Sequence, residues 1–298
     1  MQRIIPNLWF DDEAEEATEF YTRTFANASI GRSMRYNEAS AQTAGREPGS
    51  VMSREFVLEG FAFYVLNGSF GFEFSPANSF IFTCDDRDEI ERLWTELSVD
   101  GSELMPLDSY DFSDCYGWCE DRFGLSWQLM YAPEADRGIV PCLMFAGDRY
   151  GSAEDAIDLY TSTLPDSSVG FIDRHGPDDD LHREGTVSFA EFTLYDECFV
   201  AMESAGDHDF DFTQAVSYIV QCDDQAEIDT YWEGLTSEGG EGQRFGWITD
   251  RFGVSWQVVP HRIRTLLHTA DDDTVQRITE ALLNMTKIDF DELKAAAE

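Results

Sequence analysis

The chain has 298 residues, of which 43% are hydrophobic, so it is long enough and apolar enough to form two domains of ordinary size. Its formal net charge is −39, from 59 acidic and 20 basic residues, and a field of this sign repels nucleic acid and anionic membranes. The sequence has no run of about 18 apolar residues, and acidic residues stand where a signal peptide needs its apolar stretch, so we predict a cytoplasmic protein without a transmembrane helix.

The first half of the chain predicts strands and helices in alternation. A β-rich run at 4–10 precedes an amphipathic helix over 15–25, and a second such helix covers 86–97. Each helix has apolar residues near one face: Ala17, Phe20, Tyr21 and Phe25 in the first, and Ile90, Leu93, Trp94 and Leu97 in the second. Further short strands are predicted at 51–60, 61–68, 79–84 and 125–130.

The second half repeats the first. The eight residues DRFGLSWQ (121–128) return as DRFGVSWQ (250–257), with one conservative change. Other matched segments are IIPNLWF (4–10) with IVPCLMF (139–145), EAEEATEFY (13–21) with SAEDAIDLY (152–160), and SFIFTCDD (79–86) with SYIVQCDD (217–224). Each half therefore reads β-α-β-β-β twice, which gives four units in the chain. We predict two domains, 1–134 and 138–261, followed by a helical C-terminal tail over 262–298.

This order of motifs resembles the PhnB-like branch of the vicinal-oxygen-chelate superfamily, which includes glyoxalase and bleomycin-resistance proteins. Members of this branch are often labelled 3-demethylubiquinone 3-methyltransferase-like. The resemblance implies an α+β fold with two tandem glyoxalase-like domains. In each domain, the two βαβββ units would form a mixed, incompletely closed, eight-stranded sheet around a cleft. Single-domain relatives pair into homodimers, so here one chain would supply both partners of a pseudo-dimer, with a homodimer of chains as a further alternative.

The resemblance also says where metal-dependent members keep their ligands. The first-strand position falls near Pro6 and Pro141, neither of which can bind a metal. The fifth-strand position falls at Ser79 and Ser217, which are weak ligands. The last-strand position falls at Gln128 and Gln257, where an ionised Glu is usual. All five histidines lie in half two: His175, His182, His208, His261 and His268.

We therefore predict no metal and no other cofactor, and keep a divalent ion as the alternative. The acidic segment around His208 could hold Ca²⁺ or Mg²⁺, although a solvated turn fits it better. Cys115 and Cys119 lack the further ligands that a zinc site needs. Cys84 and Cys222 are interpreted as small buried hydrophobic residues. The acidic residues are scattered, which favours an acidic surface typical of a whole proteome over a site for cationic ligands.

Eight residues are candidates for binding a small molecule. In 125–130, alternation turns Ser126, Gln128 and Met130 toward the expected cleft, and a glutamine amide there suits a neutral polar ligand, unless neighbouring backbone satisfies it. The same two readings apply to Gln257, with Ser79 and Ser217 beside the glutamines. The remaining candidates are Asn67 and Glu203 at equivalent strand ends, where Glu203 is a base if buried or else a solvated residue, and Trp118 and Trp247, which wall a pocket or pack in the core.

Other repeated segments are interpreted as structural. In DRFG, Asp and Gly suit a hairpin, Phe fills the edge of the core, and Arg122 and Arg251 pair with nearby carboxylates. The polar segments 37–50 and 173–186 lie at equivalent places and are either lids or disordered loops.

Three functions remain open. The first is metal-independent binding of a small molecule; the second is a metal-dependent lyase, isomerase or dioxygenase; the third is a structural or assembly role with filled clefts. A methyltransferase is not supported, because a nucleotide-derived methyl donor usually needs a Gly-rich turn between a strand and a helix. The segment 238–246 follows a predicted helix and leads into a strand, and 66–74 connects two strands.

Overall fold

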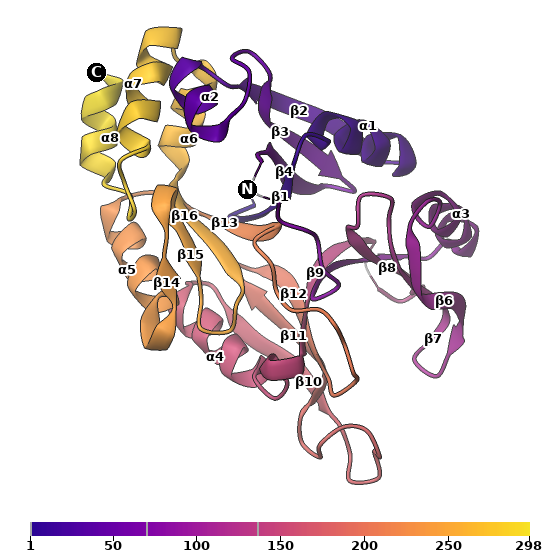
Figure 1. Ribbon diagram of the computed structural model, residues 1–298. Helices are drawn as coiled ribbons and strands as arrows, with labels where there is room; N and C mark the ends of the chain where they lie inside the picture. Colours follow the sequence, from indigo (N-terminus) through magenta and orange to yellow (C-terminus); the bar gives the residue numbers. More distant parts are fainter. Residues whose placement is uncertain (1, 70, 136) are drawn as a thin grey trace.

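The computed structural model describes residues 2–69, 71–135 and 137–298, and it contains two mixed eight-stranded sheets with helices on their outer sides (Figure 1). The strands of half one are β1 (Ile4–Phe10), β2 (Ala28–Arg35), β3 (Val51–Leu58), β4 (Phe61–Asn67), β5 (Asn78–Cys84), β6 (Ser102–Tyr110), β7 (Ser113–Glu120) and β8 (Ser126–Tyr131). Its helices are α1 (Ala14–Thr24), α2 (Glu38–Ala44) and α3 (Arg87–Leu97).

Half two repeats this order and adds the C-terminal helices. Its strands are β9 (Gly138–Ala146), β10 (Ser168–Arg174), β11 (Val187–Leu194), β12 (Glu197–Ser204), β13 (Val216–Cys222), β14 (Glu241–Gly242), β15 (Trp247–Thr249) and β16 (Ser255–Pro260). Its helices are α4 (Ala153–Thr163), α5 (Gln225–Leu235), α6 (His261–Thr269), α7 (Asp272–Leu282) and α8 (Phe290–Ala297), with 3-10 turns at Gly147–Arg149, Ser237–Gly239 and Arg244–Gly246. No helix in the described part of the chain is both long and apolar enough to cross a membrane.

Each sheet combines one unit from each half. Sheet A has the order β14-β15-β16-β13-β1-β4-β3-β2, and sheet B has the order β10-β11-β12-β9-β5-β8-β7-β6. The two units of one half therefore do not share a sheet, and that expectation is wrong, although two incompletely closed eight-stranded sheets are present as predicted. Within each sheet, the two units join through their antiparallel first strands, β1 with β13 in sheet A and β5 with β9 in sheet B.

Chain connectivity gives a physical reason for this pairing. The first strands of the units are similar apolar segments, so local sequence does not specify which copy each one pairs with. The connection between β8 and β9, residues 132–137, has only to cross β5, a distance of about 10 Å between next-nearest strands. A short connection of this kind keeps the second and third units in one sheet.

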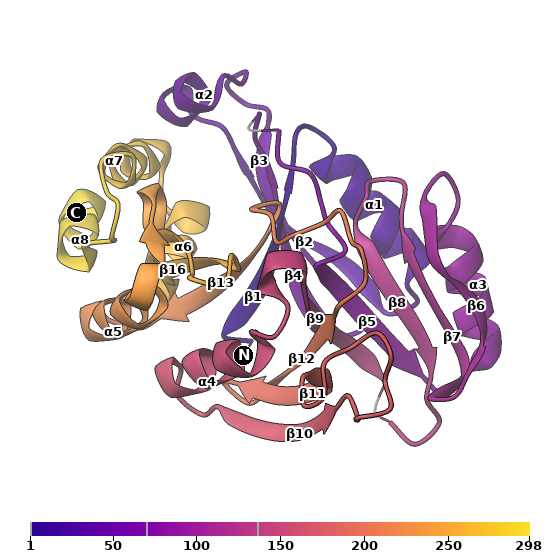
Figure 2. The ribbon, with the colours of Figure 1, turned by 60° about the horizontal axis from the view of Figure 1, so that its bottom comes forward.

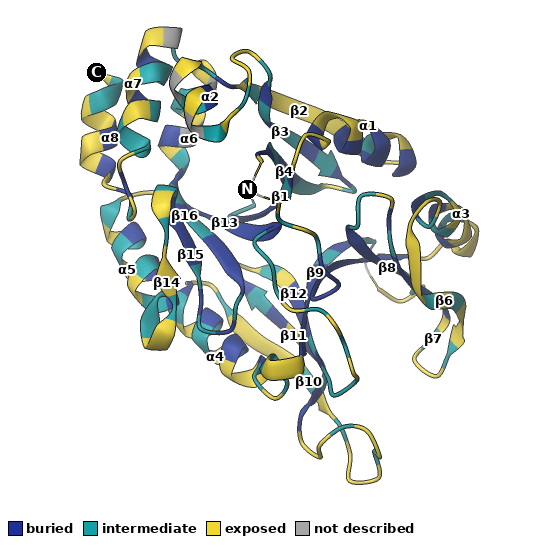
Figure 3. Cartoon of the chain, viewed as in Figure 1, coloured by how far each residue is buried: buried dark blue, intermediate teal, exposed yellow. Residues whose placement is uncertain are grey.

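The outer face of each sheet packs against helices and forms the main core (Figure 3). The predicted apolar faces are confirmed, with Trp94 half-buried and the others buried: Ala17, Phe20, Tyr21, Phe25, Ile90, Leu93 and Leu97. Trp127 and Trp256, from the two SWQ segments, are fully buried. At about 25 cal/mol per Å², an indole of this size contributes roughly 5 kcal/mol of hydrophobic stabilisation.

A buried carboxylate organises each DRFG turn. Asp121 Oδ1 accepts hydrogen bonds from the amides of Phe123 (2.8 Å) and Leu125 (3.2 Å). Its Oδ2 accepts from Tyr21 Oη (2.7 Å) and Trp127 Nε1 (3.0 Å). Asp250 has the same four contacts, with Phe252, Val254, Tyr160 and Trp256. The turn thus ties a helix, a loop and the last strand together, so its structural interpretation is confirmed.

The other residues of DRFG also have the expected roles. Gly124 and Gly253 have positive φ values of 84° and 94°, which a side chain would strain. Arg122 donates to Glu16 Oε1 at 2.7 Å, and Arg251 pairs with Glu238. The motif recurs because each copy closes one sheet against its outer helices.

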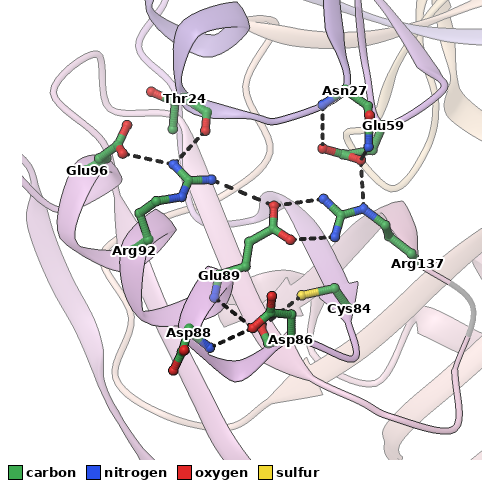
Figure 4. Close-up of polar contacts among 10 residues, drawn as sticks. All are labelled: Thr24, Asn27, Glu59, Cys84, Asp86, Asp88, Glu89, Arg92, Glu96 and Arg137. Carbon is green, nitrogen blue, oxygen red and sulfur yellow. Dashed lines mark hydrogen bonds and ion pairs between the residues drawn. The ribbon is translucent and has the colours of Figure 1, made fainter.

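An arginine between the halves joins the two sheets (Figure 4). Arg137 Nε donates to Glu59 Oε2 (2.8 Å), at the turn between β3 and β4, and its two terminal nitrogens donate to the carboxylate of Glu89 on α3 (2.6 and 2.8 Å). Burial alone would raise the pKa of Glu59, but hydrogen bonds from Arg137 and Asn27 lower it below its usual value. The side chain of Glu59 is only 1% exposed, so it depends on this cation.

The C-terminal tail is helical, as predicted, and it lies beside segment 37–50 (Figure 2). That segment contains α2 and not only a loop. Asn37 caps α2 by accepting from the amide of Ser40 (2.9 Å), and its Nδ2 donates to Thr279 Oγ1 on α7 (3.3 Å). The expectation of a disordered loop at 37–50 is therefore wrong, because a capped helix packs there against the tail.

Candidate functional site

Polar side chains gather on the inner face of each sheet, which is the face away from α1, α3, α4 and α5. On sheet B, Gln128 Nε2 donates to Ser79 Oγ (2.8 Å), and Tyr116 Oη donates to Gln128 Oε1 (2.8 Å). Trp118 Nε1 donates to Ser126 Oγ at 2.7 Å. The amide of Gln128 is thus hydrogen-bonded by two side chains, and not by the neighbouring backbone that the sequence analysis kept as one alternative.

The inner face of sheet B is closed by its own side chains. Gln128 is 1% exposed and Ser79 is fully buried. Apolar residues from several strands pack around them: Ile81, Met105, Met130, Cys142, Met144, Phe189 and Met202. Burial raises the pKa of Cys142 to about 12, so this residue is present as a neutral thiol at physiological pH.

Sheet A carries a polar cluster, here defined as Asn7, Ser217 and Gln257. Asn7 and Ser217 lie directly opposite each other on β1 and β13. Ser217 Oγ accepts from Gln257 Nε2 (2.9 Å) and from Asn7 Nδ2 (3.4 Å). Gln257 is half-buried, in contrast to its counterpart on sheet B. Trp9 and Trp247 lie beside the polar cluster with ring centroids 5.0 Å apart.

One substitution between the repeats changes the hydrogen bonding of the two glutamines. Tyr116 precedes the Gly-Trp pair of half one and donates to Gln128, whereas Phe245 precedes the same pair in half two. Phenylalanine has no hydroxyl group, so the carbonyl of Gln257 lacks the donor that engages Gln128. The two inner faces are therefore not equivalent.

The donors at the expected metal positions are neutral. Alternation along β1 sends Ile4, Pro6 and Leu8 outward and Asn7 inward, and Cys142 takes the same place on β9. The first-strand position therefore falls one residue beyond the prolines considered from the sequence, and the alternation in IIPNLWF would have located it. A transition metal does not fit either set of side chains. Sheet A offers Asn, Ser and Gln, and sheet B offers Ser, Gln and a neutral Cys thiol.

Two candidates lie on the outer faces. Asn67 Oδ1 accepts from the amide of Ala14, the first residue of α1, at 2.9 Å. Glu203 Oε1 accepts from the amide of Ala153, the first residue of α4, and its Oε2 accepts from the amide of Val187, both at 2.7 Å. Both side chains are buried and satisfy helix N-termini, a role that the sequence interpretation missed.

The histidines of segment 173–186 form a separate cluster. His175 and His182 both direct Nδ1 to Asp179 Oδ2 (3.0 Å each), and the three could in composition hold a metal ion. Their rings are stacked, with centroids 3.8 Å apart and planes 7° from parallel. The nitrogen lone pairs of two parallel rings point along parallel directions and do not meet at one point. One ion therefore cannot bind a nitrogen of each ring in this arrangement. Hydrogen bonds from the amides of His182 and Leu181 lower the pKa of Asp179.

Comparison with known proteins places these features in a family. A model of the family described as 3-demethylubiquinone-9 3-methyltransferase matches residues 2–130 and again 137–259. A PhnB protein from Bacillus cereus is 38% identical, covering 44% of this chain and 100% of its own, with a TM-score of 0.40. Glyoxalase I from Zea mays is 12% identical, covering 89% of this chain and 95% of its own, with a TM-score of 0.59, a likeness in fold alone. No curated protein matches significantly.

The two matches of the family model cover each half and leave out only the tail and the junction. Each sheet takes strands from both halves, and the two halves repeat each other. Both features agree with a tandem glyoxalase-like architecture within one chain. The protein therefore belongs to the family described as 3-demethylubiquinone-9 3-methyltransferase, as a tandem two-domain member.

Proposed function

We propose that the protein binds a small, neutral, polar molecule at the inner face of sheet A, without a metal ion. The observation that carries this proposal is the polar cluster. Its two amides and one hydroxyl group meet in the middle of the sheet, and one of its members, Gln257, is half-buried. Amide groups both donate and accept, so they suit a ligand with carbonyl and hydroxyl groups. Trp9 and Trp247 offer an apolar wall for a ring.

Sheet B has a structural role in this proposal. Its glutamine is engaged on both sides, and methionine and aromatic side chains fill the space around it. Buried polar groups that are fully hydrogen-bonded make a face rigid and leave little for a ligand to replace. One sheet thus supports the binding surface of the other.

The family description names a methyltransferase that acts on a quinone. From that description we keep the quinone ring as a possible kind of ligand, and we do not keep the methyl transfer. A nucleotide-derived donor usually binds at a Gly-rich turn from a strand into a helix. The Gly-rich segment 238–246 instead follows α5 and leads into β15, and 68–77 connects β4 with β5. These two connections lack the strand-to-helix order of such a turn, so methyl transfer is not part of this proposal.

The test is ligand titration against the full chain before and after treatment with a chelator. The probes are planar neutral molecules with carbonyl and hydroxyl groups, including a hydroxylated, methoxylated benzoquinone. We expect Gln257→Leu to weaken binding by roughly ten-fold, the effect of losing one or two hydrogen bonds. Chelation should leave the affinity unchanged, and native mass spectra should show no stoichiometric transition metal.

Gln128→Leu on sheet B is the matched control. It removes the same amide at the equivalent position, and we expect it to leave ligand affinity unchanged while reducing stability. Loss of binding after chelation would instead favour a metal-dependent lyase, isomerase or dioxygenase. Equal weakening by both glutamine variants would contradict a site on sheet A.

A further inference from the structure

A cavity lies where β1 leads into α1 in half one; Trp9 lines it, but no residue of the polar cluster does. Its volume is about 530 Å³, and it is bounded by the end of β1, by segment 72–74 and by the DRFG turn. Aromatic rings form much of its wall, with Phe10, Phe74 and Phe123 among them. The acidic residues Asp11, Glu13, Glu16 and Glu73 also line it. Arg122 lines it as well, but its guanidinium group is paired with Glu16 Oε1 at 2.7 Å.

Half two contains the same arrangement of rings. Phe10 lies edge-on to Phe74 and Phe123, with centroids 5.0 and 5.9 Å away. Phe145 lies edge-on to Phe212 and Phe252 in the same way, at 5.1 and 6.4 Å. The two places also face each other across the pseudo-dimer: Ser75 Oγ donates to the carbonyl of Asp211, and Thr213 Oγ1 donates to that of Glu73, each at 2.7 Å.

A guanidinium group of the chain itself occupies this place in half two. Arg149 Nη1 donates to the carbonyl of Arg251 (3.1 Å), and its Nε lies 3.6 Å from Asp211 Oδ2. The group lies against Gly253, where a Cβ atom would come within 3.4 Å of Arg149 Nη2. At the equivalent Gly124 the near neighbour is Phe74 Cβ, at 3.9 Å, and no counterpart of Arg149 lies within 4 Å of that position.

The difference follows from the connection between strand and helix. In half two, residues 146–152 join β9 to α4 and include the 3-10 turn that presents Arg149. In half one the shorter segment 11–13, which is wholly acidic, joins β1 to α1. The arginine of the DRFG turn is not the cause, because its Cζ lies 4.7 Å from the following Phe ring in both halves.

We propose that the cavity of half one binds the guanidinium group of a small organic cation, in the place that Arg149 fills in half two. Glu73, the counterpart of Asp211, would pair with that group, and Asp11 and Glu13 would add negative charge. Aromatic faces and edges around a carboxylate suit a planar cation, since guanidinium groups both stack and form charge-assisted hydrogen bonds. This site is separate from the polar cluster of sheet A.

Calorimetric titration of the full chain with agmatine tests the proposal. We expect one agmatine to bind per chain, and N-(4-aminobutyl)urea, which keeps the amine but has a neutral urea in place of the guanidinium group, not to bind. Glu73→Gln should weaken agmatine binding by roughly ten-fold or more, as expected for loss of a charge-assisted pair. Glu103→Gln removes an exposed carboxylate on β6, outside the cavity, and is the matched control for net charge.

A second variant tests the equivalence of the two places. Arg149→Ala removes the internal guanidinium group, so the variant should be less heat-stable, bind a second agmatine and regain thermal stability with millimolar agmatine. Gln257→Leu should leave agmatine binding unchanged, which separates this site from the one on sheet A. Binding of N-(4-aminobutyl)urea as tight as agmatine, or equal weakening by Glu73→Gln and Glu103→Gln, would overturn the proposal.

Discussion

At the scale of single residues, the repeated aspartate explains why eight residues occur twice. Asp121 and Asp250 each accept four hydrogen bonds. Two come from backbone amides of the same turn, one from a tyrosine of a helix and one from a tryptophan of a strand. Burial raises the pKa of Asp121 to about 6, against the effect of these four bonds. The residue is thus a structural anchor with an unusual titration, buried too deeply to contact a ligand.

Removal of one donor should reveal that titration. The folded state binds the proton of Asp121 more tightly than the unfolded chain does, so the stability that this carboxyl contributes falls as the pH rises from about 4 to about 6. Tyr21→Phe withdraws a bond that favours the ionised form. We expect it to cost about 2 kcal/mol of unfolding free energy above pH 6 and less at pH 4, measured by urea unfolding.

Tyr131→Phe is the control, because it removes a hydroxyl from a half-buried tyrosine of β8 outside the anchor. Its cost should be small and independent of pH. A Tyr21→Phe cost that stays constant from pH 4 to pH 7 would contradict the titration assigned to Asp121.

At the scale of elements, the first helix of each half begins at a buried acceptor from a neighbouring strand. Asn67 serves α1 and Glu203 serves α4, although both residues could be taken for ligand-binding groups when only their strand-end positions are known. The amide and the carboxylate solve the same problem, because the first amides of a helix have no partner within the helix. The difference between the halves is therefore one of chemistry and not of role.

Glu203→Ala should destabilise the protein by about 2 kcal/mol, because it leaves the buried amides of Ala153 and Val187 without their acceptor. Glu203→Gln, which keeps one acceptor oxygen, should cost less. Thermal unfolding would compare both with Glu191→Ala, a change at an exposed residue of β11 that should stay within about 0.5 kcal/mol. Equal costs for Glu203→Ala and Glu191→Ala would contradict the capping role.

At the scale of the whole molecule, the two halves of the sequence are not the units of packing. Sheets A and B each take strands from both halves, and the junction arginine, Arg137, bonds to a turn of sheet A and to a helix that covers sheet B. A chain folded in this way contains the interface that two copies of a single-domain protein would otherwise form. Contacts at the junction should therefore contribute to global stability.

Arg137→Ala tests this expectation. Glu59 and Glu89 would lose the cation that they share, and we expect a loss of about 2 kcal/mol in urea unfolding. Arg87→Ala breaks a pair with Glu91 in which both side chains are about half exposed, 54% and 53%, so it should cost less than about 1 kcal/mol. If the two variants lose the same stability, the junction is not an important contact between the sheets.

Much of the fold could be predicted from the sequence, and less of the site. Periodicity located the helix faces around Phe20 and Leu93, and the repeat located the strands, because both patterns are local. The resemblance places the metal-ligand position on β1 near Pro6, one residue away from Asn7. It identifies the strand, but it does not say which residues of that strand point to the inner face of the sheet. The hydrogen bond from Tyr116 to Gln128, and the half-burial of Gln257, exist only after the sheets have formed.

The sequence by itself determined four βαβββ units, their apolar faces and the family, since these follow from local periodicity and from repetition. Only the tertiary structure decided which units share a sheet, because similar first strands compete for the same partners and the connections between them settle the pairing. It also decided that Arg149 fills in one half the place that is a cavity in the other. The physical reason is the same in both cases: groups far apart in the chain meet only when the fold closes.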